Sequence, residues 1–279
     1  MIVFPNAKIN LGLRVVARRT DGFHNIETVF VPVKLCDALE VIASHDGTFH
    51  FDQTGLAIPG DPSNNLCIRA CRLLQPLIFE KTRETALSDL PPVRVHLHKV
   101  IPMGAGLGGG SSDGAWMLKL LNELFNLELS AYQLRGFASR LGSDCAFFID
   151  NKPVVAFEKG DHFLPLQQPL PDLEVALVFP GIHCDTAEAY RSIVPHQPPI
   201  SLQTLIQQPV DTWRKTVFND FEKPVFNLHP KIAGLKEQLY QAGAVYASLT
   251  GSGSAVYGLF EELPDIQTLF PEYQSWCSK

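Results

Sequence analysis

A glycine-rich stretch at residues 102–112 limits the possible structures of this chain more than any other segment, because five of its eleven residues are glycine. It follows an alternating apolar run at residues 93–101 and precedes a helical pattern at residues 111–127. Glycine allows backbone N–H groups to converge on an anion, and a helix N-terminus adds unpaired N–H groups with a partial positive charge. The order strand, glycine loop, helix therefore predicts a phosphate-binding site.

Two other glycine motifs explain the stretch less well. A Walker A loop ends in Gly-Lys-Ser/Thr, whereas this stretch holds no lysine. Residues 104–109 do match the dinucleotide pattern Gly-x-Gly-x-x-Gly, but that motif needs an acidic residue at the end of the next strand. Glu128 has the right distance and lies instead in a predicted link between two helices. A flexible turn is disfavoured because Met103 and Leu107 are residue types that proteins usually bury.

The stretch reads Pro-Met-Gly-Ala-Gly-Leu-Gly-Gly-Gly-Ser-Ser and resembles the second motif of the GHMP kinases, named after galactose, homoserine, mevalonate and phosphomevalonate kinases. Its triple glycine is most similar to the branch that phosphorylates an alcohol with a cytidine diphosphate group in non-mevalonate isoprenoid precursor biosynthesis. The resemblance implies ATP with Mg²⁺, which phosphates and water would mainly hold, with Ser111 or Ser112 near the metal. It also implies that ATP contacts Pro102, Met103, Gly104, Ala105, Gly106, Leu107, Gly108, Gly109, Gly110, Ser111 and Ser112.

Residues 5–13 read Pro-Asn-Ala-Lys-Ile-Asn-Leu-Gly-Leu and lie in the first strand of a predicted hairpin, whose turn is marked by Asp21 and Gly22. On a strand, Lys8 and Asn10 point to the same face, which is also the pattern of any half-exposed strand. The segment resembles the first motif of the GHMP kinases. That resemblance implies that Lys8 is catalytic and that Asn10 binds substrate.

Residues 143–149 read Ser-Asp-Cys-Ala-Phe-Phe-Ile and follow a predicted helix, where an aspartate is often only a cap or turn residue. The segment resembles the GHMP motif Gly-Ala/Ser-Asp-Val-Pro-Phe-Phe, which implies that Asp144 is the catalytic base. Cys145 and Ala146 replace the usual Val-Pro, so a less rigid turn is expected with the carboxylate retained. Phosphoryl transfer depends on positioning and charge stabilisation, and Lys8 would offset the charge and keep Asp144 ionised.

The tip of the predicted hairpin carries Phe23 and His24, within the sequence Asp-Gly-Phe-His. This element resembles the cytidine diphosphate branch, in which the aromatic ring stacks on cytosine and the histidine meets the base edge through its backbone. A helix predicted to begin at Thr186 places Tyr190 where that branch supplies the other face of the cytosine. The structural alternatives are an exposed aromatic at a hairpin tip and a core tyrosine on an amphipathic helix.

Two later segments also resemble the GHMP kinases. Residues 219–222, Asn-Asp-Phe-Glu, resemble the opening of a helix in the C-terminal lobe, and residues 249–255, Leu-Thr-Gly-Ser-Gly-Ser-Ala, resemble the third motif. The fold implied is α+β and two-lobed, with a ribosomal S5 domain 2-like N-terminal lobe at residues 1–158 and a ferredoxin-like C-terminal lobe at residues 159–279. The proline-rich residues 151–171 are predicted to link the lobes.

Composition narrows the function further. A formal net charge of −6 disfavours a nucleic-acid groove, and no apolar run approaches the length of a membrane span. The six cysteines form no C-x-x-C pair, so neither zinc nor a disulfide framework is indicated. His96 and His98 alternate on a strand and are interpreted as solvent-facing. A cytoplasmic monomer or homodimer is expected, and the alternative functions are another GHMP kinase, of homoserine or mevalonate type, and a non-catalytic nucleotide-binding or dinucleotide-dependent protein.

Overall fold

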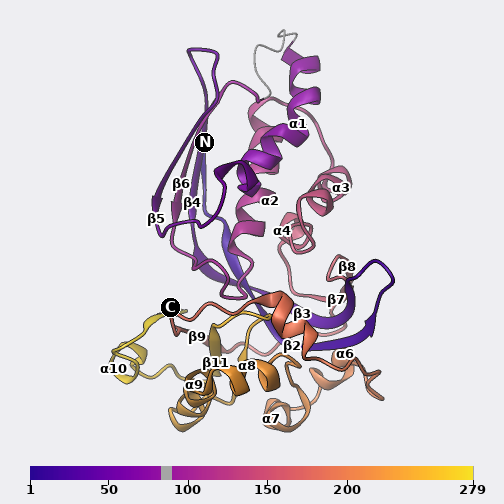
Figure 1. The fold of residues 1–279 in the computed structure, drawn as a ribbon, viewed down its shortest axis with the longest axis vertical. Helices are drawn as coiled ribbons and strands as arrows, with labels where there is room; N and C mark the ends of the chain where they lie inside the picture. The colour runs from indigo at the N-terminus through magenta and orange to yellow at the C-terminus, as the bar shows by residue number, and fades with distance from the viewer. Residues whose placement is uncertain (83–89, 279) are drawn as a thin grey trace. The chain divides into compact units, whose positions relative to one another are not determined.

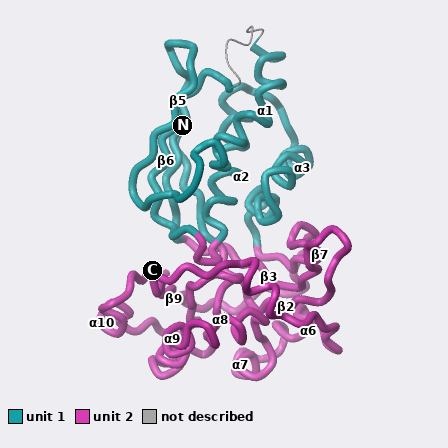
Figure 2. The backbone as a smooth tube through the Cα atoms, viewed as in Figure 1, with its two compact units in different colours: residues 1–7, 35–103, 108–152 teal, residues 8–34, 104–107, 153–279 magenta. Residues whose placement is uncertain are grey.

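The computed structural model describes residues 1–82 and 90–278, and the chain forms two compact units (Figure 2). Each unit is assembled from segments that lie far apart along the sequence. The lobes predicted at residues 1–158 and 159–279 are stretches of continuous chain and stay a prediction. The first unit contains residues 1–7, 35–103 and 108–152, and the second contains residues 8–34, 104–107 and 153–279.

A four-stranded sheet in the first unit has the order β1-β4-β6-β5, and only β5 and β6 are parallel. One face is buried because the apolar residues of β6 alternate with polar ones, as the sequence predicts. His96 and His98 lie on the exposed face, and both rings contact the hydroxyl of Thr54. The strands are β1 (Ile2–Val3), β4 (Ala38–Ala43), β5 (His50–Gly55) and β6 (Val93–Lys99).

Helices α1 and α2 lie along one side of this sheet (Figure 1). Ser130 and Gly142 predict a helix over residues 131–141, and α3 has these bounds. Ser130 and Gln133 form a complete capping box at its start. The polar residues 81–89 are predicted from the sequence to form a surface loop. Residues 81 and 82 instead continue α1, and residues 83–89 lie outside the described residues. The helices are the 3₁₀ turn η1 (Pro62–Asn64), α1 (Leu66–Thr82), α2 (Gly109–Leu124), α3 (Ala131–Leu141) and α4 (Phe147–Asp150).

A second sheet has the order β2-β3-β7-β8 and contains the predicted N-terminal hairpin, β2 (Asn6–Arg18) and β3 (His24–Cys36). The prediction that residues 151–171 are only a link is wrong in part. They contain β7 (Val154–Glu158), which pairs with β3, and β8 (His162–Pro165). The prolines lie outside the strands or at a strand end, so they leave the β-branched residues of β7 free to pair.

The third sheet has the order β10-β11-β9-β12, with every pairing antiparallel, and α9 packs against β10 and β11. Buried residues of α9 and of these strands share one apolar core. The strands are β9 (Glu174–Phe179), β10 (Tyr246–Leu249), β11 (Val256–Phe260) and β12 (Gln274–Cys277). The helices are α5 (Thr186–Arg191), α6 (Leu202–Leu205), the 3₁₀ turn η2 (Val210–Thr212), α7 (Trp213–Thr216), α8 (Glu222–Leu228), α9 (Pro230–Gln241) and α10 (Ile266–Leu269).

Groups of helices and strands follow one another along the chain, and the sheets are largely antiparallel, so the predicted α+β class is confirmed. Among the described residues, no helix combines the length and apolar character that crossing a membrane requires.

Candidate active site

The phosphate loop (residues 102–112) adopts a left-handed backbone at alternate glycines. The φ angles of Gly104, Gly106 and Gly108 are 70°, 81° and 69°. Such alternation turns successive N–H groups toward one concave surface that suits an anion. Helix α2 begins at Gly109, before the predicted residue 111. The hydrogen bond from Ser112 N to Gly108 O closes its first turn. The predicted loop and helix N-terminus are therefore continuous.

Residues 104–107 of the phosphate loop belong to the second unit, and three consecutive carbonyls among them accept hydrogen bonds from other segments of that unit. Ala105 O accepts from the N–H of Ala255 at 3.3 Å, and Gly106 O accepts from the Thr250 hydroxyl at 3.1 Å. Leu107 O accepts from the N–H of Lys8 at 2.9 Å. The segments predicted separately as the first, second and third motifs therefore meet in one place.

Glycine is required where the phosphate loop meets the turn at residues 250–255, called here the Thr250 turn. A Cβ atom at Gly106 would lie 1.9 Å from the carbonyl oxygen of Thr250, and one at Gly253 would lie 2.1 Å from the nitrogen of Gly106. No real Cβ makes such contacts with a backbone. The two turns consequently pack main chain against main chain.

Lys8 and Asn10 are both buried on β2, at 3% and 1% exposure, so the alternative of a half-exposed strand is excluded. The ammonium of Lys8 donates to Asn10 Oδ1 at 2.5 Å and lies 4.8 Å from the centre of the Phe30 ring. Asn10 Nδ2 donates to the hydroxyl of Thr28 at 3.0 Å. The amide of Asn10 therefore holds Lys8 in place, while its predicted contact with substrate stays a prediction.

Asp144 lies in the first unit, in the turn between α3 and α4, and is half-buried. The turn follows Gly142, which caps α3. Beside it the Cys145 thiol is buried, and burial raises the pKa of that thiol to about 12. The thiol is consequently protonated at neutral pH, and the role of Asp144 as the base stays a prediction.

A buried ion cluster behind the phosphate loop was not predicted from the sequence. Lys99 Nζ donates to Asp37 and to Asp113, at 2.8 Å in the second case, and all three side chains are buried. Asp37 Oδ1 also accepts the N–H groups of Val100 and Ile101. The cluster therefore joins β6, α2 and the residue between β3 and β4, beneath the start of the loop. The available signal was the alternation of β6, which places Lys99 on the same face as the buried apolar residues.

Two opposing effects set the pKa values in this cluster. Burial raises the pKa of Asp113 to about 7, while the charge of Lys99 opposes the shift and the neighbouring Asp37 adds to it. Burial alone would lower the pKa of Lys99, but the two carboxylates outweigh it and raise that pKa. The ammonium is thus charged throughout the neutral range, and Asp113 is the group that titrates.

Asp113→Asn is expected to flatten the pH dependence of stability. Folded Asp113 retains a proton between about pH 4 and pH 7 that the unfolded chain has released, so its contribution to stability is present below about pH 4 and is lost as the pH rises toward 7. The free energy of unfolding, measured in urea, should therefore fall less between pH 5 and pH 7 in the variant than in the wild type. The control is Asp150→Asn, which replaces an exposed carboxylate. Equal falls in the free energy of unfolding for the wild type and Asp113→Asn would contradict the assignment of Asp113 as the titrating group.

Ser112 and Trp116 carry buried polar atoms on one face of α2. Among the described residues, Ser112 Oγ and Trp116 Nε1 have no hydrogen-bond partner. A buried hydroxyl without a partner at a helix N-terminus is suited to a phosphate oxygen or to a metal that accompanies phosphate. The residues present therefore fit Mg-ATP, with Ser112 as the candidate of the two predicted serines.

The predicted cytidine residues all lie in the second unit. Phe23 is 56% exposed at the tip of the hairpin, with Lys159 Nζ 5.6 Å from the centre of its ring. His24, rather than Phe23, stacks on Tyr190, with ring centres 4.8 Å apart and planes 19° apart. Burial lowers the pKa of His24, as does the nearby Arg18. The predicted sandwich of cytosine between Phe23 and Tyr190 stays a prediction.

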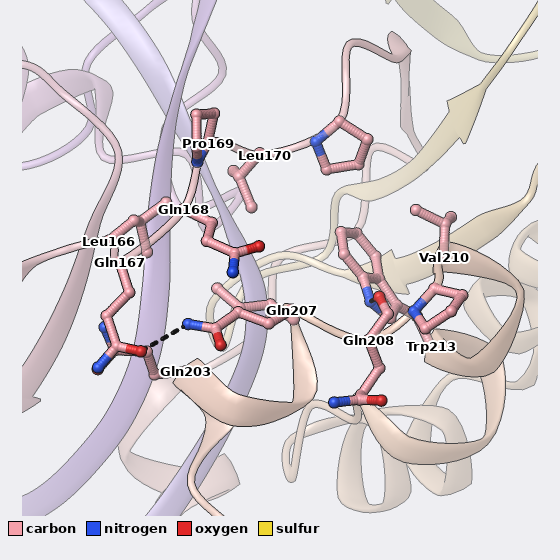
Figure 3. Close-up of a pocket in the computed structure, with 13 residues that line it drawn as sticks. Leu166, Gln167, Gln168, Pro169, Leu170, Gln203, Gln207, Gln208, Val210 and Trp213 are labelled. Carbon is pink, nitrogen blue, oxygen red and sulfur yellow. Dashed lines mark hydrogen bonds between the residues drawn. The ribbon is translucent and has the colours of Figure 1, made fainter.

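A pocket of about 370 Å³ in the second unit lies between the segment after β8 and the region of α6 and α7 (Figure 3). Its described lining residues are amides, prolines and apolar side chains, without an ionisable group. It offers neither the cation nor the base that phosphoryl transfer needs. In residues 1–82 and 90–278, no group of three or more His, Cys, Asp or Glu side chains is placed to hold a metal ion.

Comparison with protein families agrees with this geometry. The model of the GHMP kinases N terminal domain matches residues 65–152, and that of the GHMP kinases C terminal domain matches residues 202–279. The chain therefore belongs to the GHMP kinase family, as the motifs predict.

Within that family, the chain groups with proteins named 4-diphosphocytidyl-2-C-methyl-D-erythritol kinase. One from Azobacteroides pseudotrichonymphae is 49% identical over 94% of both chains, and one from Bacteroides thetaiotaomicron is 49% identical over 94% of this chain and 92% of the relative. A crystal structure of a kinase of the same substrate has 31% identity and a TM-score of 0.80 over 99% of this chain and 98% of that one. The Methanococcus jannaschii mevalonate kinase, at 13% identity and a TM-score of 0.71 over 99% of this chain and 97% of that one, shares the fold.

Proposed function

We propose that this protein transfers the γ-phosphoryl group of ATP to the 2-hydroxyl of 4-diphosphocytidyl-2-C-methyl-D-erythritol, in the biosynthesis of isoprenoid precursors. The observation that carries the reaction class is the meeting of the phosphate loop with Lys8 and the Thr250 turn. The substrate follows from near full-length relatives that bear its name.

In the proposed phosphoryl transfer, the phosphate loop, Lys8 and Asp144 each have a separate role. The phosphate loop binds the ATP phosphates through its N–H groups and the start of α2. Lys8, held by Asn10, faces the developing negative charge. Asp144 accepts the proton of the attacking hydroxyl. Bound Mg²⁺ would supply further neutralisation of phosphate charge, with the Ser112 hydroxyl as the side chain suited to hold it.

The function is tested by ADP release from purified protein with Mg-ATP and each of four alcohols, namely the cytidine compound, homoserine, mevalonate and galactose. Turnover with the cytidine compound alone is expected. Turnover with another alcohol would preserve the kinase class and remove the cytidine site. ATP binding without ADP release from any mixture would favour a non-catalytic nucleotide-binding protein.

Phe23→Ala is expected to weaken binding of the cytidine substrate by about 1 to 3 kcal/mol, the range for stacking of one base on an aromatic ring. The KM for that substrate should rise by about 5- to 150-fold, with a smaller effect on the KM for ATP. Phe4→Ala provides the control, because Phe4 is a similarly exposed phenylalanine on another segment. An unchanged KM in the Phe23 variant would place the cytidine elsewhere.

A further inference from the structure

Asn219 precedes α8 and is almost fully buried, with 2% of its surface exposed. Its Nδ2 donates to two backbone carbonyls, those of Leu249 and Gly251, each at 2.8 Å. Its Oδ1 accepts the N–H of Phe221 at 3.0 Å. Both amide hydrogens are therefore used on the carbonyls that lie on either side of Thr250.

The segment around Asn219 is also bound to β2, the strand that carries Lys8. The N–H of Leu13 donates to Phe218 O at 3.0 Å, and the N–H of Asp220 donates to Leu13 O at 2.8 Å. Asn219 thus forms a parallel bridge with Leu13. A shift of this segment would move β2 as well as the Thr250 turn.

Thr250 passes this constraint to the groups that the proposed function uses. Its hydroxyl accepts the N–H of Asn10 at 3.1 Å and donates to Gly106 O at 3.1 Å. Asn10 in turn accepts from the ammonium of Lys8. The chain of contacts runs from Asn219 through Thr250 to both the lysine and the phosphate loop, and every member lies in the second unit.

We propose that Asn219 is a positioning residue for phosphoryl transfer, which acts on Lys8 and the phosphate loop by fixing both peptide groups beside Thr250. The inference rests on the proposed function. Within the contact the two turns meet largely as glycine backbone, and the Thr250 hydroxyl is already bonded to Asn10 and Gly106. Asn219 lies outside the Thr250 turn and supplies two further donors that fix its orientation.

Asn219→Asp is the decisive variant because it preserves shape and replaces the two donated hydrogens by a carboxylate that faces two carbonyls. We expect kcat to fall about 10²-fold, the effect of a displacement of about 1 Å at a reacting centre, with a much smaller change in the KM for the alcohol. Asn122→Asp is the matched control. Asn122 also bonds backbone groups through both ends of its amide, at Leu129 in the first unit, and kcat should stay near the wild-type value.

A purely structural role would lower the unfolding temperature of Asn219→Asp and leave the kcat of the folded protein unchanged. Activity is therefore measured well below the unfolding midpoint and normalised to the folded fraction from circular dichroism. If the wild type turns over substrate and Asn219→Asp has the same kcat, the inference about Asn219 is overturned and the proposed function stands. Absence of turnover in the wild type would instead remove the proposed function on which it rests.

Two variants of Thr250 decide the question should Asn219→Asp not fold. Thr250→Val keeps the volume and removes the hydroxyl, whereas Thr250→Ser keeps the hydroxyl and its two contacts. We expect the valine variant to lose kcat to a similar extent and the serine variant to retain most of it. Equal kcat values in the valine variant and the wild type would refute the coupling.

Discussion

Asp144→Asn is expected to lower kcat by about 10² to 10⁴-fold, the usual contribution of a positioned general base. The asparagine has almost the shape of the aspartate, so the turn between α3 and α4 should keep its conformation, but the amide accepts no proton from the attacking hydroxyl. Binding of ATP should stay near the wild-type value, because the phosphate loop and its carbonyl contacts are untouched. The measurements are kcat from ADP release and the Kd for ATP from calorimetry.

Asp150→Asn is the control for this prediction. Asp150 is a partly exposed carboxylate a few residues further on, where it pairs with Arg135. Surface ion pairs of this kind contribute little to the free energy of unfolding. Its kcat should equal that of the wild type. Undiminished turnover in the Asp144 variant would remove the assignment of the base, and a parallel loss in both variants would indicate disturbance of α4 instead.

Lys99→Met should produce the largest loss of stability, about 3 to 5 kcal/mol in the free energy of unfolding, because it leaves two buried carboxylates without their cation. Asp113 can relieve part of this penalty by taking up a proton, since burial already raises its pKa to about 7. The loss should therefore be smaller at pH 5 than at pH 8. Urea unfolding at both values measures it.

Lys81→Met is the matched control for the lysine substitution. Lys81 lies in the same unit and pairs with Glu128 at 3.9 Å on the surface, so its removal should cost less than about 1 kcal/mol. The double variant Lys99→Met with Asp113→Asn should recover part of the stability, because one of the uncompensated carboxylates is gone. A Lys99 variant as stable as the wild type would show that the cluster is not needed.

Local signals in the sequence predicted the elements that depend on local chemistry. Ser130 and Gln133 define the start of α3, and β6 follows from the alternating apolar run at residues 93–101. The hairpin at β7 and β8 was read as a link because its flanking prolines resemble linker composition. Pairing of β7 with β3, more than a hundred residues earlier, decides its structure, and no local pattern reports that pairing.

In the candidate site, too, local motifs could be predicted from the sequence, whereas contacts between distant residues could not. The glycine stretch could be singled out because it lies between a strand pattern and a helix pattern, whereas Lys8 became a candidate only through the resemblance of residues 5–13 to the first GHMP motif. The partners of Lys99 could not be foreseen, since Asp37 lies between β3 and β4, 62 residues earlier, and Asp113 lies on a helix. The two hydrogen bonds of Asn219 likewise join residues about 30 positions apart, so its motif was visible while its contacts were not.

The carbonyl contacts of the phosphate loop bear on how the protein is made. A ribosome completes residues 104–107 well before Thr250 and Ala255, which supply two of the three groups that bond these carbonyls. During translation, an emerging chain therefore carries the loop sequence for roughly half the time of synthesis without the partners that shape it. A chain that ends before Thr250 therefore lacks the partners that bond the carbonyls of Ala105 and Gly106.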